Sequence, residues 1–175
     1  KYASRPKSLT QQQVRNIFSG KTTRWNEVGG DNRKIEVWQR PEDSGSQSTM
    51  LAKVMKETPM LPPRETEVAQ GMGGIVRKVA YYQNNKGAIG YTFRYYVTKM
   101  NPHKGIKLLA IEGVAPTVET IRDGRYPFAV DVYMVTRENP NEQTQKIVRW
   151  FLSPPGQSLV EDVGYVPLYR TLENH

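Results

Sequence analysis

One stretch of the sequence organises the rest of the chain: Ile35-Glu-Val-Trp-Gln-Arg-Pro-Glu-Asp-Ser-Gly-Ser-Gln-Ser-Thr-Met-Leu51. Ile35 and Val37 alternate with polar neighbours, which is typical of the end of a strand. Pro41 has no N–H to donate to a neighbouring strand, so we expect the strand to end there. Apolar residues at a helical spacing follow from Met50 onward. The pattern therefore predicts a strand, then a polar turn, then a helix.

The turn at residues 40–46 has the composition of an anion-binding site, and we call it the anion turn. The first N–H groups of a helix have no partner within the helix, and the helix dipole favours an anion there by roughly 0.3–1 kcal/mol. Arg40 can bind the same anion through two parallel hydrogen bonds, and the hydroxyls of Ser44 and Ser46 can add further ones. We interpret the turn as an oxyanion site, with phosphate as the best candidate.

A plain helix cap is the simpler interpretation of the same residues. Serine and aspartate before a helix are most often N-caps, and an arginine beside them is often a surface charge. From these residues alone the cap is the more frequent outcome. The stretch also lacks the GxxxxGK[ST] pattern of a nucleotide-binding P-loop. The rest of the chain has to decide between a cap and a binding site.

The composition is that of a globular protein that can build a core. The chain has 175 residues, of which 37% are apolar and 24% charged. This length suits one ordinary domain or two small lobes. The absence of cysteine excludes disulfides and thiolate metal sites, but it does not determine the compartment. No apolar run approaches the roughly 18 residues of a membrane span, and the polar start at Lys1 suggests a mature form or a piece of a longer chain.

Charge and motif content weaken two other classes of function. The net charge of +8 would suit a polyanion, yet lysine and arginine are spread along the chain and no RRM, zinc-finger or KH signature occurs. A nucleic-acid-binding domain is therefore only an alternative. The two histidines are His103 and His175, and no HExxH or GxSxG motif is present. Ser44 has no base placed near it by the sequence, so we expect no enzyme, no metal and no cofactor.

Strand-like and helical patterns alternate along the chain, which predicts an α/β fold. A second loop-to-helix junction follows at Gly71-Met-Gly-Gly74, where Gly73 and Gly74 could expose backbone N–H groups to a ligand or simply make a tight turn. Helices are predicted after Thr10, after Ser46, from Ile75, after Thr117, from Glu142 and again after Pro154-Pro155; further strands are predicted at residues 87–91, 106–111 and 126–136.

Several stretches in a fixed order match a known family. They are Ile17-Phe-Ser-Gly-Lys-Thr-Thr-Arg-Trp-Asn-Glu-Val-Gly-Gly30, the anion turn, Gly87-Ala-Ile-Gly-Tyr91, Ile111-Glu-Gly-Val-Ala-Pro-Thr117 and Ser153-Pro-Pro-Gly-Gln157. Each piece alone is modest, but their order and spacing over almost the whole chain are specific. The sequence resembles the PstS-like phosphate-binding proteins of bacterial ABC transporters. Its Ser44-Gly45-Ser46 form is most similar to those of Gram-positive bacteria.

The resemblance implies a type II periplasmic-binding-protein fold, in which two lobes close on phosphate without catalysis. It assigns phosphate contacts to Arg40, Ser44, Gly45 and Ser46, and it assigns to Glu42 the role of orienting the arginine. It also implies an ABC permease as the membrane partner, no nucleic acid, and an extracytoplasmic location in the periplasm or anchored at the cell surface. Another oxyanion, or a sensor or adhesion role on the same fold, remains the alternative.

The chain departs from the family at two places. Asp43 replaces a glycine, and we expect its carboxylate to face solvent because it would repel a bound dianion. In addition, the family's first lobe begins with about a hundred residues that have no counterpart here, the size of one small lobe. Those residues carry the other half of the phosphate ligands, including the carboxylate that accepts the phosphate proton. We therefore expect this chain to bind phosphate weakly, if at all.

The same departure predicts the domain organisation. The resemblance implies a hinge strand at residues 1–8 and a nearly complete lobe at residues 9–125, with a mixed sheet flanked by helices. Residues 126–175 would be the returning strand and C-terminal helices of the other, incomplete lobe. The apolar face of residues 142–163 must then be covered by something else. We expect it to pack on residues 9–125 or on a second copy of the chain, which would make a homo-oligomer through the 126–175 face.

Overall fold

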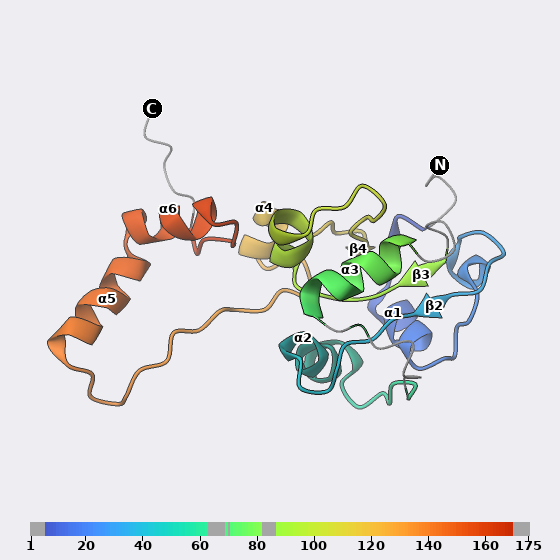
Figure 1. Cartoon of the computed structure of the whole chain (residues 1–175), viewed down its shortest axis with the longest axis horizontal. Helices are drawn as coiled ribbons and strands as arrows, with labels where there is room; N and C mark the ends of the chain where they lie inside the picture. The colour runs from blue at the N-terminus through green and yellow to red at the C-terminus, as the bar shows by residue number, and fades with distance from the viewer. Residues whose placement is uncertain (1–5, 63–68, 70, 82–86, 170–175) are drawn as a thin grey trace. The chain divides into compact units, whose positions relative to one another are not determined.

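The computed structural model describes residues 6–62, 69, 71–81 and 87–169 (Figure 1). The chain divides into two compact units, Lys1–Pro116 and Thr117–His175, and each is described by itself. The lobe boundaries predicted at residues 8 and 125 remain predictions. Most of the predicted hinge strand, residues 1–5, lies outside the described residues, as does His175.

The strands of the first unit form two short parallel pairs. β1 (Ser8–Leu9) pairs with β4 (Ala110–Ile111), and β2 (Glu36–Val37) pairs with β3 (Ala88–Ile89). Parallel neighbours need a crossover connection, and helices supply it here. The predicted α/β class is thus confirmed. The described residues contain two separate pairs rather than one mixed sheet, and the strand predicted at residues 106–111 is reduced to its last two residues.

Helix α1 (Gln11–Phe18) forms where the sequence predicts it, because both of its ends carry local signals. The Thr10 hydroxyl accepts the N–H of Gln13 at 3.0 Å, and the Gln13 side chain accepts the N–H of Thr10 at 2.8 Å. This reciprocal capping box satisfies donors that the helix itself leaves unpaired. Gly20 then turns the chain with a φ of 79°. The helix buries Ile17 and Phe18, the apolar face expected from their spacing.

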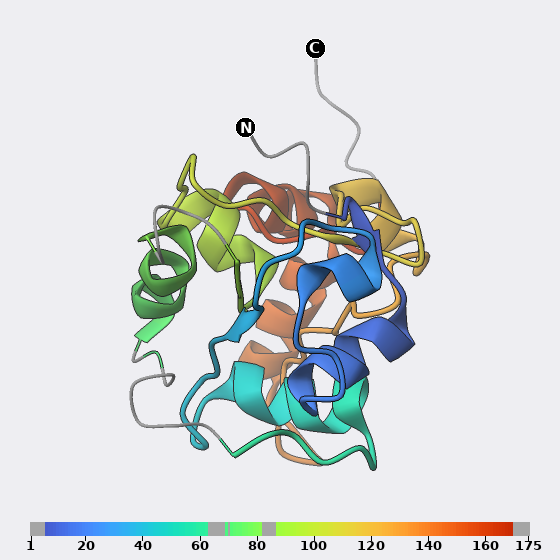
Figure 2. The ribbon, with the colours of Figure 1, turned by 90° about the vertical axis from the view of Figure 1, so that its right-hand side faces the viewer.

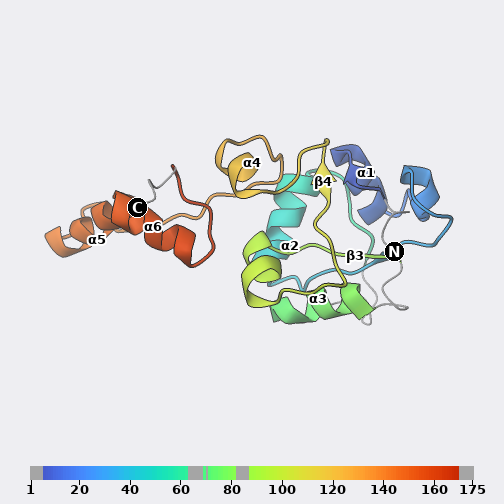
Figure 3. The same cartoon turned by 90° about the horizontal axis from the view of Figure 1, so that it is seen from above.

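The pair β2–β3 lies between α1 and α3 (Gly71–Tyr81), as Figures 2 and 3 show from two directions. The core on the α3 side contains Trp38, Ala69, Ile75, Val76, Ala88 and Val97. Ile75, Val76 and Ala80 are buried, so the helical face predicted from Ile75 onward is confirmed. This layered packing holds β2, and the turn that follows it, between two apolar layers.

The helix that follows the anion turn has two parts. α2 (Gly45–Thr49) continues directly into a π-helical segment, η2 (Met50–Met55), which packs on α1 (Figure 2). Met50, Val54 and Met55 are buried, whereas Leu51 is 43% exposed. The predicted helix is therefore present in π-helical form, and one of the four apolar residues predicted for its buried face points outward.

The regular secondary structure in the described part of the second unit is helical. It contains α4 (Val118–Arg122), α5 (Glu142–Leu152) and α6 (Pro154–Asp162), each near its predicted place (Figure 1). Asn141 caps α5 by accepting the N–H of Thr144 at 2.9 Å. Pro154 and its neighbour start α6, where a missing N–H costs nothing. At the corner between α5 and α6, a Cβ on Gly156 would lie 2.2 Å from the Trp150 carbonyl oxygen.

The strand predicted at residues 126–136 is wrong. The structure has a turn near Tyr126 and then irregular chain, and no described residue of this stretch belongs to a strand. The apolar side chains stay in solvent: Val132 is 80% exposed, Tyr133 79% and Val135 88%. A strand needs a hydrogen-bonded neighbour, and alternating apolar residues do not provide one. Separately, none of the described helices is both long and apolar enough to cross a membrane.

Candidate functional site

The anion turn lies at the carboxyl edge of the β2–β3 pair. The Trp38 N–H, just beyond β2, donates to the Ile89 carbonyl at 2.8 Å. Arg40 lies two residues after Trp38, and Tyr91 lies two residues after Ile89. The Arg40 N–H donates to the Tyr91 hydroxyl at 3.2 Å. In α/β proteins, ligands bind beyond the carboxyl ends of parallel strands. The residues predicted to bind an anion therefore occupy the edge where such sites occur.

Arg40 is the chemically distinctive residue of this edge. It is only 6% exposed, and its Nη1 donates to the carbonyl oxygens of Ala69 and Gly71. Its Nε is buried and has no hydrogen-bond partner, and Arg40 forms no ion pair within the described part of the chain. Leaving a buried donor unpaired costs about 1–3 kcal/mol, and more for a charged group. An anionic acceptor would remove that cost.

The two serines of the turn face each other. Their hydroxyl oxygens lie 2.9 Å apart, and Ser46 is only 4% exposed. Ser44 occupies the N-cap position, and its carbonyl accepts the N–H groups of Gln47 and Ser48. Its side chain, however, makes no capping hydrogen bond. The plain-cap interpretation therefore accounts for the backbone of Ser44 but not for its hydroxyl, which is directed to Ser46.

The two carboxylates of the turn lie in solvent. Glu42 and Asp43 are both exposed, as expected for Asp43. No hydrogen bond or ion pair joins Glu42 to Arg40 in the part of the chain that the structure describes; the carbonyls of Ala69 and Gly71 hold the guanidinium instead. The orienting role of Glu42 thus remains a prediction. The turn presents hydrogen-bond donors from buried or half-buried groups, with its negative charges outside.

The second predicted junction is placed differently from the prediction. Helix α3 begins at Gly71, so Gly73 and Gly74 belong to its first turn rather than to a loop before it. A Cβ on Gly73 would lie 2.9 Å from the Asn101 side-chain oxygen, so close packing is enough to explain a glycine at this position. A ligand role for either glycine stays a prediction. The link to the anion turn runs through the Gly71 carbonyl, which accepts a hydrogen bond from Arg40.

Two residues next to the turn were not identified from the sequence. The Tyr91 hydroxyl donates to the Gln47 side-chain oxygen while it accepts the Arg40 N–H. Burial raises the pKa of Tyr91, and the hydrogen bond from Arg40 and its positive charge partly oppose that rise. The hydroxyl therefore keeps its proton at neutral pH. The available signal was the position of Tyr91 at the end of a predicted strand, next in space to the strand before the turn.

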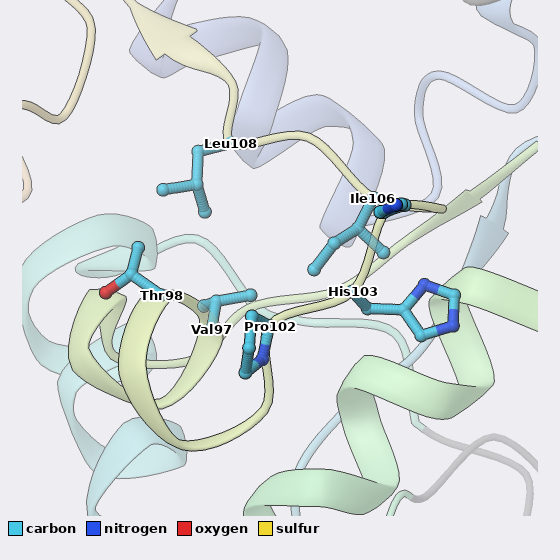
Figure 4. Close-up of a pocket in the computed structure, with 7 residues that line it drawn as sticks. Val97, Thr98, Pro102, His103, Ile106 and Leu108 are labelled. Carbon is cyan, nitrogen blue, oxygen red and sulfur yellow. The ribbon is translucent and has the colours of Figure 1, made fainter.

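A separate hollow in the first unit has a different character (Figure 4). This open hollow has a volume of about 460 Å³ beside the π-helical segment η4 (Tyr96–Met100), and apolar side chains such as Val97, Ile106 and Leu108 line much of it. His103 lies at its margin, where Nδ1 accepts the Gly105 N–H at 2.8 Å and the ring packs edge-on against Tyr81. No group of three or more acidic or histidine side chains in the described residues could hold a metal ion.

Comparison with known proteins gives a consistent result. The family model described as a PBP superfamily domain matches residues 3–155. The phosphate-binding protein PstS of Bacillus subtilis is 27% identical over 163 residues, which are 93% of this chain and 51% of the relative. The protein of the same name from Borreliella burgdorferi is 26% identical over 165 residues, with 91% and 58% covered. The chain spans about half the length of these curated relatives.

Solved structures agree on the fold. A Clostridium perfringens protein, assigned to a phosphate ABC transporter and solved with bound phosphate, matches with a TM-score of 0.71 at 26% identity; 95% of this chain and 65% of that one are covered. PstS from Borrelia burgdorferi matches with a TM-score of 0.73 at 24% identity, covering 93% of this chain and 64% of that one. At that identity the second match supports the fold alone.

Proposed function

The chain belongs to the PBP superfamily, and from this premise we propose that it is part of a solute-binding protein that captures inorganic phosphate for a bacterial ABC importer. It binds the anion at residues 40–46 and catalyses no reaction. The complete site closes when a second lobe covers the turn. We further propose that the protein works outside the cytoplasm and delivers phosphate to a membrane permease, in keeping with the transporter named for the Clostridium perfringens structure.

One observation carries this proposal: Arg40 is buried with a free Nε donor and no counter-charge in the described residues. A buried guanidinium is costly unless it is paired, and phosphate supplies both the negative charge and two acceptor oxygens for parallel hydrogen bonds from the planar guanidinium. The adjacent hydroxyls of Ser44 and Ser46 add donors within reach of the same anion. The names of the relatives and the bound phosphate in the Clostridium perfringens structure support the choice of ligand.

The composition of the turn also favours a second candidate, a fully ionised oxyanion such as sulfate. Arg40 offers only donors, and the two hydroxyls can donate as well. Glu42 and Asp43, the carboxylates that could accept a proton from phosphate, are exposed. The turn therefore attracts tetrahedral oxyanions in general. Selection of phosphate over sulfate would need an acceptor from outside residues 40–46.

Isothermal titration of the chain with phosphate and with sulfate tests the proposal. Arg40→Ala should weaken phosphate binding at least tenfold, because hydrogen bonds to charged groups contribute about 1.5–3 kcal/mol. The matched control is Arg33→Ala, which removes the same charge from an exposed arginine paired with Asp31. Ser46→Ala, a smaller change at a buried position, keeps the test decisive if Arg40→Ala fails to fold.

The expected pattern is a loss of affinity in Arg40→Ala and Ser46→Ala with Arg33→Ala close to wild type. Phosphate binding that is unchanged in both site variants would overturn the assigned site. A chain that binds no oxyanion at millimolar concentration would overturn the proposed function as stated for this chain. Equal affinity for sulfate and phosphate would favour the second candidate.

A further inference from the structure

The ladder between β2 and β3 ends in a side chain rather than in backbone. Its last backbone bond beyond the strands runs from the Trp38 N–H to the Ile89 carbonyl at 2.8 Å. Two residues after Trp38, the next N–H that points toward β3 belongs to Arg40, and it donates to the Tyr91 hydroxyl at 3.2 Å. The phenol therefore takes over from a strand carbonyl where the chain leaves β2. It fixes the backbone at the first residue of the anion turn.

The same hydroxyl also reaches the other end of the turn. It donates to the Gln47 Oε1, and Gln47 is 6% exposed and follows directly after Ser46. A phenol has one proton, and a backbone N–H can only donate. Tyr91 must therefore accept from Arg40 and donate to Gln47, so both bonds can exist together. The Tyr91 hydroxyl thus joins the backbone of Arg40, where the chain enters the turn, to the side chain of Gln47, the first residue after the turn.

Neighbouring groups hold this hydroxyl in place. The Tyr91 ring packs edge-on against Phe18 of α1, with 5.4 Å between the ring centroids. The Gln47 Nε2 lies 4.0 Å from the Met60 sulfur, which leaves its Oε1 for Tyr91. Gln47 also donates its N–H to the Ser44 carbonyl at 2.9 Å, so movement of Gln47 would move Ser44. Gln47 thus takes part both in the backbone bond that closes the turn and in the hydrogen bond from the Tyr91 hydroxyl.

We infer that Tyr91 and Gln47 are positioning residues that hold the anion turn in its binding conformation before the ligand arrives. The inference rests on the proposed function, and it names two residues outside residues 40–46. Neither is assigned a contact with the anion; they act through the backbone of Arg40 and through Ser44. A loop that is already ordered loses less conformational entropy when its ligand binds, and so binds more tightly. A purely structural pair would stabilise the fold and leave affinity unchanged.

Phosphate titration of the full chain, wild type and variants, separates these roles. Tyr91→Phe keeps the ring and removes the hydroxyl, and Gln47→Met keeps the length and removes the acceptor. Each should weaken phosphate binding about threefold to tenfold, the effect of one net hydrogen bond. Because Tyr91→Phe already removes the hydrogen bond that Gln47→Met removes, the double variant should bind no more weakly than the weaker-binding single variant. Tyr81→Phe removes a hydroxyl from a 65% exposed tyrosine and should bind as wild type does.

A second measurement needs no ligand. In nitrogen-15 spectra of the phosphate-free chain, the backbone N–H signals of Gly45 and Ser46 should be sharp in the wild type and broadened by exchange in Tyr91→Phe. A merely structural role would lower the melting temperature without that broadening. If Tyr91→Phe does not fold, Gln47→Met gives both readouts, because its phenol ring is intact.

The outcomes distinguish this inference from the proposed function. If Arg40→Ala weakens phosphate binding while Tyr91→Phe and Gln47→Met bind within twofold of wild type, the inference is overturned and the proposed function stands. Strictly additive losses in the double variant would also overturn it, because the two residues would then act independently. A chain whose phosphate binding does not depend on Arg40, or that does not bind phosphate, overturns both.

Discussion

The two units of the chain treat similar apolar sequence patterns in opposite ways. In the first unit, Ile17 and Phe18 of α1 are 0% and 2% exposed. In the second, Ile147 and Leu152 of α5 are 56% and 55% exposed, although their helix is as strongly patterned and properly capped. Prolines apart, every buried apolar side chain in the described residues lies between Leu9 and Ile111. An amphipathic pattern thus predicts the helix and its face, but burial needs a partner surface.

The comparison also bears on the expected partner of residues 142–163. That apolar face was predicted to pack on residues 9–125 or on a second copy of the chain. The described contacts within the second unit leave Leu152, Leu159 and Val163 exposed. Exposed apolar surface of this kind favours association. Homo-oligomer formation through the 126–175 face therefore remains a prediction, and light scattering measures it directly.

The largest expected effect is the difference between matched core substitutions in the two units. Phe18→Ala should lower the free energy of unfolding by about 3–5 kcal/mol, because it leaves a cavity between α1 and its neighbours. Leu152→Ala should change it by no more than about 0.5 kcal/mol, as for most exposed positions. Urea unfolding followed by circular dichroism measures both. A large loss in Leu152→Ala would show that the α5 face is covered in solution and would remove the contrast.

A smaller effect is expected from Tyr126, a partly buried tyrosine of the second unit. Burial raises the pKa of Tyr126 to about 12, above its unfolded value near 10. Between these values the unfolded state releases a proton that the folded state keeps, so stability is complete below pH 10 and falls as the pH rises toward 12. The loss should reach about 2 kcal/mol at most, since the ring is partly exposed.

Denaturant unfolding between pH 9 and pH 12 checks this expectation. Tyr126→Phe should reduce the loss above pH 10 and leave stability at pH 8 nearly unchanged. If wild type and variant follow the same curve through pH 12, the burial assigned to Tyr126 is absent in solution, and the second unit is even more open than described.

The smallest effect, about 1 kcal/mol for each helix, concerns the two caps. Thr10 and Asn141 each accept one N–H at the start of α1 and α5, at 3.0 and 2.9 Å. Thr10→Ala should lower the midpoint of the unfolding transition that the fluorescence of the buried Trp25 and Trp38 reports. Asn141→Ala should lower only the midpoint at which the helices of the second unit unfold. Both variants are made in a Trp150→Phe background, so that tryptophan fluorescence reports only on the first unit. Equal shifts of both transitions by either variant would show that the units unfold together.

Local signals explain what the sequence could predict of the fold. Thr10, Thr117 and Pro154 act within their own helices, through capping or a preset backbone angle, and α1, α4 and α6 begin beside them as expected. The strand at residues 126–136 was wrong because a strand depends on a neighbour that sequence alternation cannot supply. The π-helical segment η2 was equally hidden, since its residues have an ordinary α-helical pattern.

The residues of the candidate site also fall into those that local sequence could predict and those that it could not. Arg40, Ser44 and Ser46 could be proposed from adjacent residues, because a strand, a turn and a helix follow one another there. The carbonyls of Ala69 and Gly71 that hold Arg40, and the Tyr91 hydroxyl that joins it to Gln47, come from distant parts of the chain. The Tyr91 contact depends on the parallel pairing of β2 with β3, whereas Ala69 is placed beside Arg40 by its own N–H, which donates to the Gln39 carbonyl at 2.9 Å. Without an alignment of strands, no local pattern indicates them.

Gly156 has a consequence for how this sequence can change over time. A side chain there would place its Cβ 2.2 Å from the Trp150 carbonyl oxygen and 2.6 Å from the Phe151 Cα, so it would collide with backbone that cannot rotate away. Every missense change at this codon should therefore be lost from a population selected for folding. The exposed apolar residues a few positions away meet no such backbone obstacle within the described chain. The corner between α5 and α6 would then stay recognisable in descendants whose helices no longer resemble each other.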